Sequence, residues 1–320
     1  MKDVPKKVVI ILTVIYFFVL IFQAATLIIM TGKATNIGEA SLIILLAPIS
    51  VHAPFNLTAN LNPDGSSIDI NWSNISEAQH YNIYYSSNLS QIRDLDPNNL
   101  GPDVIAVSGI TDTNWTDCNA SRNKTRYYTV SAARNSLINV SKEAVGKCEL
   151  DLVKGNNMIS LCLNRSYTAE SFLEPINSTQ YIPSIIKLDR PSQTVESWIA
   201  HAKGYGADYN LELGKGYITT LDHNMSYIVT GHIFYDVFTL KLIKGNNLIG
   251  IDGNRTYTAE SFLEPINSTQ YLPSIIKLDR PSQTAESWIA HAKGYGTDYA
   301  MYVGKGYILT LDHNMSYTLR

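Results

Sequence analysis

The sequence predicts a mainly β protein with an N-terminal transmembrane helix, a β-sandwich, and two near-identical small β-rich modules that each contain a short helix. Three observations predict this class. An uncharged stretch of 23 residues stands near the N-terminus, short runs of alternating apolar and polar residues follow, and residues 154–221 recur almost unchanged at 244–311. Alternation with a period of two is typical of half-buried strands.

The domain boundaries follow from these changes of pattern. A chain of 320 residues is long enough for two or three domain-sized cores. We expect a cytoplasmic tail at 1–7, a transmembrane anchor at 8–30, a linker or strand at 31–50, the sandwich at 51–148, and the modules at 149–236 and 237–320.

The uncharged stretch is long enough to cross a membrane. As a helix, residues 8–30 extend about 35 Å, against a hydrocarbon core of about 30 Å. Lys2, Lys6 and Lys7 precede this stretch, so the positive-inside rule leaves the tail in the cytoplasm and the bulk of the chain outside. The alternative is a signal peptide cleaved near residues 32–34 (Gly-Lys-Ala), which gives a secreted protein.

The charge of the chain excludes nucleic acid as a partner. The net charge is −3, and the 25 lysines and arginines are scattered along the sequence. Such a chain has no basic field that attracts phosphate groups.

Three cysteines indicate at most one disulfide. They are too few for a disulfide-rich scaffold, and they lack the spacing of a zinc site. The second module has Asp252 where the first has Cys162, so this thiol is dispensable to the module fold. We therefore expect a bridge between Cys118 and Cys148, in an oxidising exterior.

An exterior location also predicts N-linked glycosylation. Fourteen Asn-x-Ser/Thr triplets follow the anchor. The alternative explanation is a polar β protein rich in Asn and Ser turns. The glycosylation candidates are Asn56, Asn71, Asn74, Asn88, Asn114, Asn119, Asn123, Asn139, Asn164, Asn177, Asn224, Asn254, Asn267 and Asn314.

Short alternating runs between turn residues predict the sandwich. The expected strands are 54–59, 68–72, 81–85, one around Trp115, and 127–132. Ile68, Ile70 and Trp72 share one face of their strand, as a buried face requires.

These residues resemble a fibronectin type III domain, a sandwich of the immunoglobulin-like class. The resemblance rests on Trp72 in the second strand, the Tyr-x-Ile-x-Tyr run at 81–85, and the Arg-Tyr-Tyr-x-Val-x-Ala run at 126–132. It implies that Trp72 is the core tryptophan and that Tyr127 or Tyr128 is the tyrosine of the sixth strand. It implies no catalytic residue. The alternative is that the aromatic residues form a platform for sugars.

Each module has the pattern of strands around one short helix. In the first copy we expect strands at 150–153, 158–163, 185–189, 196–200, 218–221 and 226–229, with a turn at 154–157. Thr168 is the expected cap of a two-turn helix, because Ala169, Phe172 and Leu173 follow with helical spacing. We explain Gly214 and Gly216 by a tight turn that needs positive φ.

The modules resemble a surface module of secreted archaeal and some bacterial proteins that opens with GWNLIS and closes with GKGYW. Here the two motifs read GNNMIS at 155–160 and GKGY at 214–217, and GNNLIG at 245–250 and GKGY at 304–307. Asparagine replaces the usual tryptophan in both copies. By this resemblance the chain is an archaeal-type cell-surface protein with two tandem modules after a fibronectin type III-like domain, and no catalytic residues come with it.

One set of side chains has the composition of a metal or acid–base site. Against such a site, the Asp-His-Asn run after residue 221 is typical of a turn, and no spacing makes three ligands converge. We expect no metal, no cofactor and no catalytic residue, and keep the set as weak candidates. The residues are His201, Asp208, Asp222 and His223, with His291, Asp298, Asp312 and His313 in the second copy.

The sequence favours a non-catalytic role outside the cell. We expect a membrane-anchored, glycosylated protein for binding, adhesion or envelope display, because repetition multiplies a surface more readily than it builds one active site. The first alternative is a self-assembling structural envelope protein. The second is a carbohydrate-active hydrolase or its carbohydrate-binding accessory. The expected partners are the membrane and, as alternatives, surface glycans, envelope proteins or copies of the chain itself.

Overall fold

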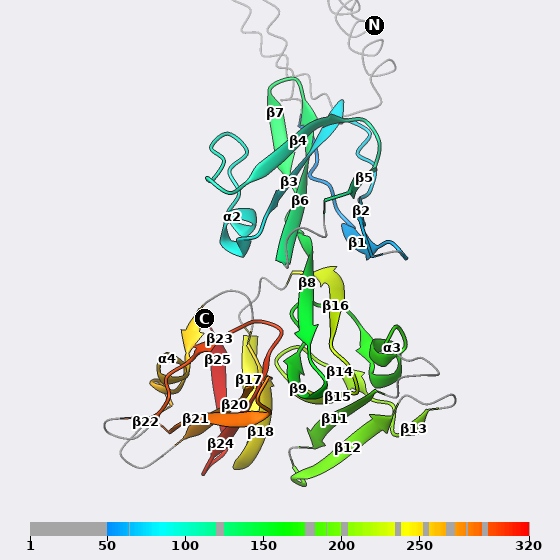
Figure 1. Ribbon diagram of the computed structural model, residues 1–320. Helices are drawn as coiled ribbons and strands as arrows, with labels where there is room; N and C mark the ends of the chain where they lie inside the picture. The colour runs from blue at the N-terminus through cyan, green and yellow to red at the C-terminus, as the bar shows by residue number, and fades with distance from the viewer. Residues whose placement is uncertain are drawn as a thin grey trace, which may run out of the picture. The chain divides into compact units, whose positions relative to one another are not determined.

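The computed structural model shows a mainly β chain with short helices (Figure 1). Among the described residues no helix has the length and apolarity to cross a bilayer; the expected tail, anchor and linker at 1–49 lie outside them. Residues 52–320 form one compact unit. The structure describes residues 50–63, 65–119, 125–176, 183–189, 191–199, 204–233, 238–251, 256–266, 273–279, 281–289 and 294–319.

The N-terminal part of this unit is a sandwich of two antiparallel sheets. One sheet has the order β1-β2-β5 and the other the order β16-β8-β6-β3-β4, with β7 beside β6. A short helix, α2 (Leu89–Arg93), follows β3. The strands are β1 (Thr58–Leu61), β2 (Ile68–Asn71), β3 (His80–Ser86), β4 (Ile105–Ile110), β5 (Asn114–Asp117), β6 (Thr125–Arg134), β7 (Leu137–Val140) and β8 (Val145–Leu152).

Aromatic rings fill the space between the two sheets. Trp72 is 5% exposed, and Tyr81 contacts it edge-on at 5.4 Å between ring centroids. Trp115 of β5 stacks on Tyr85 of β3 at 5.9 Å. The prediction that Trp72 and Tyr128 belong to the core is therefore confirmed.

A charged network is buried next to these rings. Asp117 accepts hydrogen bonds from the Arg126 guanidinium and, at 2.8 Å, from the Tyr128 hydroxyl. Burial, with the Asp117 charge, raises the pKa of Tyr128. Lys147 of β8 is wholly buried, and its Nζ has no hydrogen-bond partner in the described part of the chain. Burial lowers the pKa of this amine.

Strand β8 belongs to both the sandwich and the first module. It pairs with β6 through Val145–Cys148 and with β16 (Met225–His232) along its whole length. The expected boundary at 148/149 therefore falls inside one continuous strand. One cluster of buried apolar residues accordingly joins the first module to α2 and Tyr127 of the sandwich, whereas the second module has a cluster of its own.

The two modules repeat the same strand order. The first has a five-stranded sheet in the order β13-β12-β11-β15-β9, and the second has β18-β24-β20-β21-β22. The first contains β9 (Gly155–Ser160), β10 (Tyr167–Thr168), α3 (Ala169–Leu173), β11 (Ser184–Asp189), β12 (Thr194–Ile199), β13 (Tyr205–Gly206), β14 (Asn210–Leu211), β15 (Gly216–Leu221) and β16. The second contains β17 (Phe238–Leu242), β18 (Gly245–Gly250), β19 (Tyr257–Thr258), α4 (Ala259–Leu263), β20 (Ser274–Asp279), β21 (Thr284–Ile289), β22 (Tyr295–Gly296), β23 (Ala300–Met301), β24 (Gly306–Leu311) and β25 (Met315–Leu319).

The short helix begins where the sequence predicts. The Thr168 side chain accepts a hydrogen bond from the Ser171 amide, and the Ser171 hydroxyl bonds back to the Thr168 amide, which makes a capping box. Phe172 and Leu173 are wholly buried. The helix is shorter than predicted because its last residue, Leu173, is followed by a turn.

Two expectations about the first module were wrong. The strand predicted at 158–163 begins at Gly155 and ends at Ser160, because the chain leaves the sheet there in both copies. The disulfide joins Cys148 to Cys162, not to Cys118, which is exposed and has no disulfide partner. Since Cys148 lies in β8, the bridge fastens the first module to the strand it shares with the sandwich, and Cys162 needs no counterpart in the second copy.

The buried tryptophan gives a test of the sandwich. Trp72→Ala leaves a cavity beside Tyr81, and we expect the free energy of unfolding to fall by about 3–5 kcal/mol. Chemical denaturation followed by circular dichroism measures this change, with Ile105→Ala at an exposed position as the control. A free energy of unfolding equal to that of the unsubstituted protein would contradict a packed core around Trp72.

The buried lysine gives a test that depends on pH. Lys147→Met removes an amine without a hydrogen-bond partner, and we expect the protein to gain about 1–3 kcal/mol of stability at neutral pH. The pKa of the Lys147 amine is lower in the folded state than in the unfolded chain. At a pH between these two values the unfolded chain therefore binds more protons than the folded one. As a result, the protein with Lys147 gains stability as the pH rises through that window.

The difference in free energy of unfolding between Lys147→Met and the protein with Lys147 must therefore become smaller as the pH rises toward 10.5, the ordinary pKa of lysine. Denaturation curves from pH 7 upward measure this difference, and Lys142→Met at an exposed site is the matched control. A difference that grows with pH, or a variant that is less stable at pH 7, would contradict the prediction.

Candidate functional site

The side chains with the composition of a metal site do not come together in the described part of the chain. No group of three His, Cys, Asp or Glu residues that could hold a metal ion occurs there. His201 and His291 lie outside the described residues. Asp208 accepts a hydrogen bond from the Glu170 amide at 2.9 Å and so holds the first turn of α3, and Asp298 does the same for α4.

The remaining candidates form a local turn in each copy. The imidazole Nδ1 of His223 lies 2.7 Å from Oδ1 of Asp222, and His313 has the same contact with Asp312. Next to them, Asn224 Oδ1 accepts a hydrogen bond from the Lys154 amide at 2.7 Å. The Asp-His-Asn run therefore fixes the chain between two strands, as the turn interpretation predicts.

The glycosylation candidates lie mostly on the surface. Of the ten whose side chains the structure describes, Asn71 is half-buried and the others are exposed. Asn123, Asn177, Asn254 and Asn267 lie outside the described residues.

The feature that sequence reasoning missed is the contact between the two modules. The Ser160 amide donates to the Gly304 carbonyl at 3.1 Å, and the Gly250 amide donates to the Gly214 carbonyl at 3.0 Å. Residues 160 and 250, and residues 214 and 304, occupy equivalent positions ninety residues apart. The contact is therefore reciprocal, as across a twofold axis in a homodimer.

Two glutamines fasten the ends of this contact. The Gln283 side chain accepts from the Asn156 amide at 2.7 Å and donates to the Asn156 carbonyl at 3.0 Å. Gln193 holds Asn246 in the same way, at 2.8 and 3.1 Å. Both glutamines have positive φ, 56° and 55°, which is uncommon for a residue with a side chain and costs free energy.

The repeated glycines allow the two backbones to approach. A Cβ at Gly216 would lie 2.7 Å from the Ile249 carbonyl oxygen, and one at Gly306 would lie 2.6 Å from that of Ile159. A Cβ at Gly304 would lie 2.7 Å from Cδ2 of Leu150. The explanation of the Gly-Lys-Gly motif by positive φ is thus wrong for Gly216, which is absent from the left-handed region, and incomplete for Gly214.

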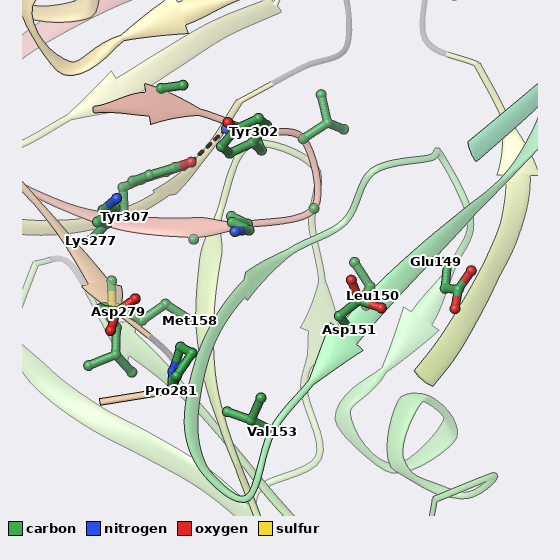
Figure 2. A pocket seen from close by; sticks show the side chains of 16 residues that line it. Glu149, Leu150, Asp151, Val153, Met158, Lys277, Asp279, Pro281, Tyr302 and Tyr307 are labelled. Atoms are coloured by element: carbon green, nitrogen blue, oxygen red, sulfur yellow. Dashed lines mark hydrogen bonds between the residues drawn. The ribbon is translucent and has the colours of Figure 1, made fainter. Parts of the chain in front are cut away.

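Two clefts open where the modules meet, each lined by residues of both copies. The first cleft, of about 290 Å³, lies between β8 of the first module and Lys277, Asp279 and Tyr302 of the second (Figure 2). The second cleft, of about 480 Å³, is lined by the equivalent positions, including Lys187 and Asp189. The reciprocal contact therefore produces two clefts that are lined by equivalent backbone positions of the two modules.

The walls of the first cleft present an aromatic ring between charges. The Tyr302 side chain is 56% exposed, and the Lys305 ammonium lies 5.1 Å from the centre of its ring. The backbone beneath is fixed, because the Tyr302 amide donates to the Tyr307 hydroxyl at 2.7 Å (Figure 2). Hydrogen bonds from Ser282 lower the pKa of Asp279, so this carboxyl stays ionised.

The second cleft has the same backbone positions as the first but different side chains at some of them. Glu212 replaces Tyr302, and its carboxylate pairs with the Lys215 ammonium at 2.6 Å. Lys241 stands where the first cleft has Asp151. Two lysines and three carboxylates line the first cleft, so its net formal charge is −1. Three lysines and two carboxylates line the second cleft, so its net formal charge is +1. The two clefts therefore differ in the sign of their formal charge.

No protein-family model and no curated protein matches the sequence. Among solved structures the chain is similar to a Fn3-like protein from Clostridium thermocellum, with 26% identity, a TM-score of 0.23, and coverage of 28% of this chain and 83% of the other. It is also similar to the FN1–FN3 domains of chicken CNTN1, with 10% identity, a TM-score of 0.14, and coverage of 85% of this chain and 99% of the other. Both neighbours are fibronectin type III-like domain proteins.

The glutamine contacts give a symmetric prediction. In the variant Gln283→Asn, the asparagine adopts positive φ readily, but its side chain is one methylene too short to reach the Asn156 backbone. We expect the loss of these two hydrogen bonds to lower the stability of the module pair by about 1–2 kcal/mol. Urea denaturation measures the change.

Gln193→Asn is the matched variant, because it removes the equivalent pair of bonds to Asn246. The two variants should lose about equal stability. An unchanged midpoint in both, or a loss in only one of them, would contradict a reciprocal contact.

Proposed function

We propose that this chain is a non-catalytic, glycosylated binding and display protein, held at the outside of a membrane by residues 8–30. The two clefts between the paired modules are its ligand sites. The resemblance of the modules to those of archaeal surface proteins, and of residues 51–148 to fibronectin type III domains, supports an exterior role.

The observation that carries this proposal is the exposed Tyr302 ring in a cleft of mixed charge. An aromatic face packs against the C–H face of a sugar ring, whereas carboxylates such as Asp151 accept from sugar hydroxyls and ammonium groups such as Lys305 donate to them. A surface saccharide is therefore the ligand whose chemistry fits the first cleft best.

The second cleft suits a different part of the same or another ligand. Without the ring, and with Lys241 added, it favours groups that carry negative charge. One polymer that reaches both clefts binds the second intramolecularly, at a high effective concentration, and gains avidity without any new contact. Two unlike clefts on one chain thus select a polymer better than either cleft alone.

A glycan array tests the proposal with the full-length glycosylated protein in detergent. The array carries neutral oligosaccharides and oligosaccharides with uronic acids. We expect retention of a subset, and Tyr302→Ala should raise the Kd for that subset about tenfold. Tyr295→Ala is the matched control, because Tyr295 is also exposed, at 63%, but lies outside both clefts.

Other outcomes separate the competing functions. If no saccharide is retained and the protein grows in mass with concentration, the self-assembling envelope role replaces the binding role. If a saccharide is cleaved, and the cleavage is lost in a protein with both His201→Ala and His291→Ala, the chain is a hydrolase.

A further inference from the structure

Ser160 and Gly250 are equivalent residues of the two modules, and they contact each other. A Cβ built on Gly250 would lie 2.3 Å from the Ser160 Cβ and 2.7 Å from its Oγ. In a twofold arrangement a residue meets its own equivalent only at the axis. The pseudo-twofold axis of the module pair therefore passes between Ser160 and Gly250.

This position is also one where the two otherwise similar motifs differ, since GNNMIS ends in serine and GNNLIG ends in glycine. The Ser160 hydroxyl donates to the Lys305 carbonyl of the second module at 3.0 Å. Gly250 has no side chain to repeat that bond in the other direction, and it leaves the space that the Ser160 side chain fills. The two residues are thus complementary, not identical.

We infer that the face formed by the GNN and GKGY motifs is a self-recognition surface whose partner is the unlike copy of the module, and that Ser160 and Gly250 select this pairing. A like pair of the first copy places serine at both positions, with the two Cβ atoms at about the 2.3 Å found for the built Cβ. Carbon atoms in contact stand about 3.5–4.0 Å apart, so this pair cannot close.

A like pair of the second copy closes but is poorer. It has glycine at both positions, so the bond from the Ser160 hydroxyl to the Lys305 carbonyl is lost and a gap remains at the axis. The pair of unlike copies has neither defect. It is also the pair that the chain contains, so the face is filled by the chain's own second module.

The rest of the face does not discriminate in this way. Gly304 packs near Leu150 and Cys148, whereas Gly214 packs against Phe238 and Leu240 at the equivalent positions. Glycine accepts either neighbour, because it presents no side chain. Among the glycine contacts of this face, discrimination therefore falls on the axis, and the inference stands independently of the ligand proposed for the clefts.

The test exchanges the two residues in the full-length chain. Gly250→Ser introduces the clash, and backbone strain is no confounding cause, because Gly250 does not have positive φ. Ser160→Gly is the control that removes one hydrogen bond without a clash. The double variant, with both changes, moves the serine to the other side of the axis, where its hydroxyl meets the Lys215 carbonyl, the equivalent of Lys305 O.

Hydrogen exchange over residues 156–160 and 246–250 reports whether the pair is closed. We expect Gly250→Ser to raise exchange there about tenfold, and both Ser160→Gly and the double variant to stay within about threefold of the unchanged chain. Exchange in β6 of the sandwich should not change in any variant, which shows that the chain is folded.

Two results would overturn the inference. One is unchanged exchange in Gly250→Ser. The other is a double variant that exchanges as fast as Gly250→Ser, because the serine would then disturb position 250 for a reason unrelated to its partner. If Gly250→Ser does not fold, the double variant alone decides: protection equal to that of the unchanged chain supports the pairing, and its loss refutes it.

Discussion

Backbone meets backbone where the two modules join, and glycine makes this approach sterically possible. At Gly216, Gly250 and Gly306 a Cβ would come within 3 Å of an atom of the other module. The amide-to-carbonyl bonds across the axis, the glutamine contacts and both clefts depend on that approach. The motif glycines therefore serve the pairing of modules as much as the fold of each one.

The chain is stabilised unequally on the two sides of this contact. The first module shares β8 with the sandwich, and the disulfide from Cys148 to Cys162 fastens it to that strand. A disulfide that closes a loop of this size stabilises the folded state by about 3 kcal/mol. The second module has Phe238 at the position of Cys148, and its core is separate. Because residues of both modules line each cleft, a ligand bound there would also stabilise the module pair.

Local patterns predicted the elements well. Alternation at 68–72 gave β2 and its buried face, and the Thr168 cap gave the start of α3, because both features depend on neighbours in sequence. The continuity of β8 across residue 148 was not predictable, since β8 pairs with β6 on one side and with β16, some eighty residues later, on the other. The disulfide was not predictable for the same reason, because the partner of Cys148 depends on where β8 leaves the sandwich.

The clefts were beyond sequence reasoning for a further reason. Each cleft combines residues of two copies, and near identity of the copies gives no sign of which faces meet. The glycines show the limit of the sequence. A glycine without positive φ, such as Gly216, indicates close approach of another backbone, but its φ is known only from the structure.

The distance between the modules tests the closed pair most directly. Spin labels at Val195→Cys and Ala285→Cys, equivalent exposed positions on β12 and β21, report this distance by pulsed electron resonance in a full-length chain that also carries Cys118→Ser. A pair closed within each chain predicts one narrow distance distribution that does not change when labelled chains are diluted with unlabelled ones. A broad distribution, or a peak that disappears on dilution, would contradict the account.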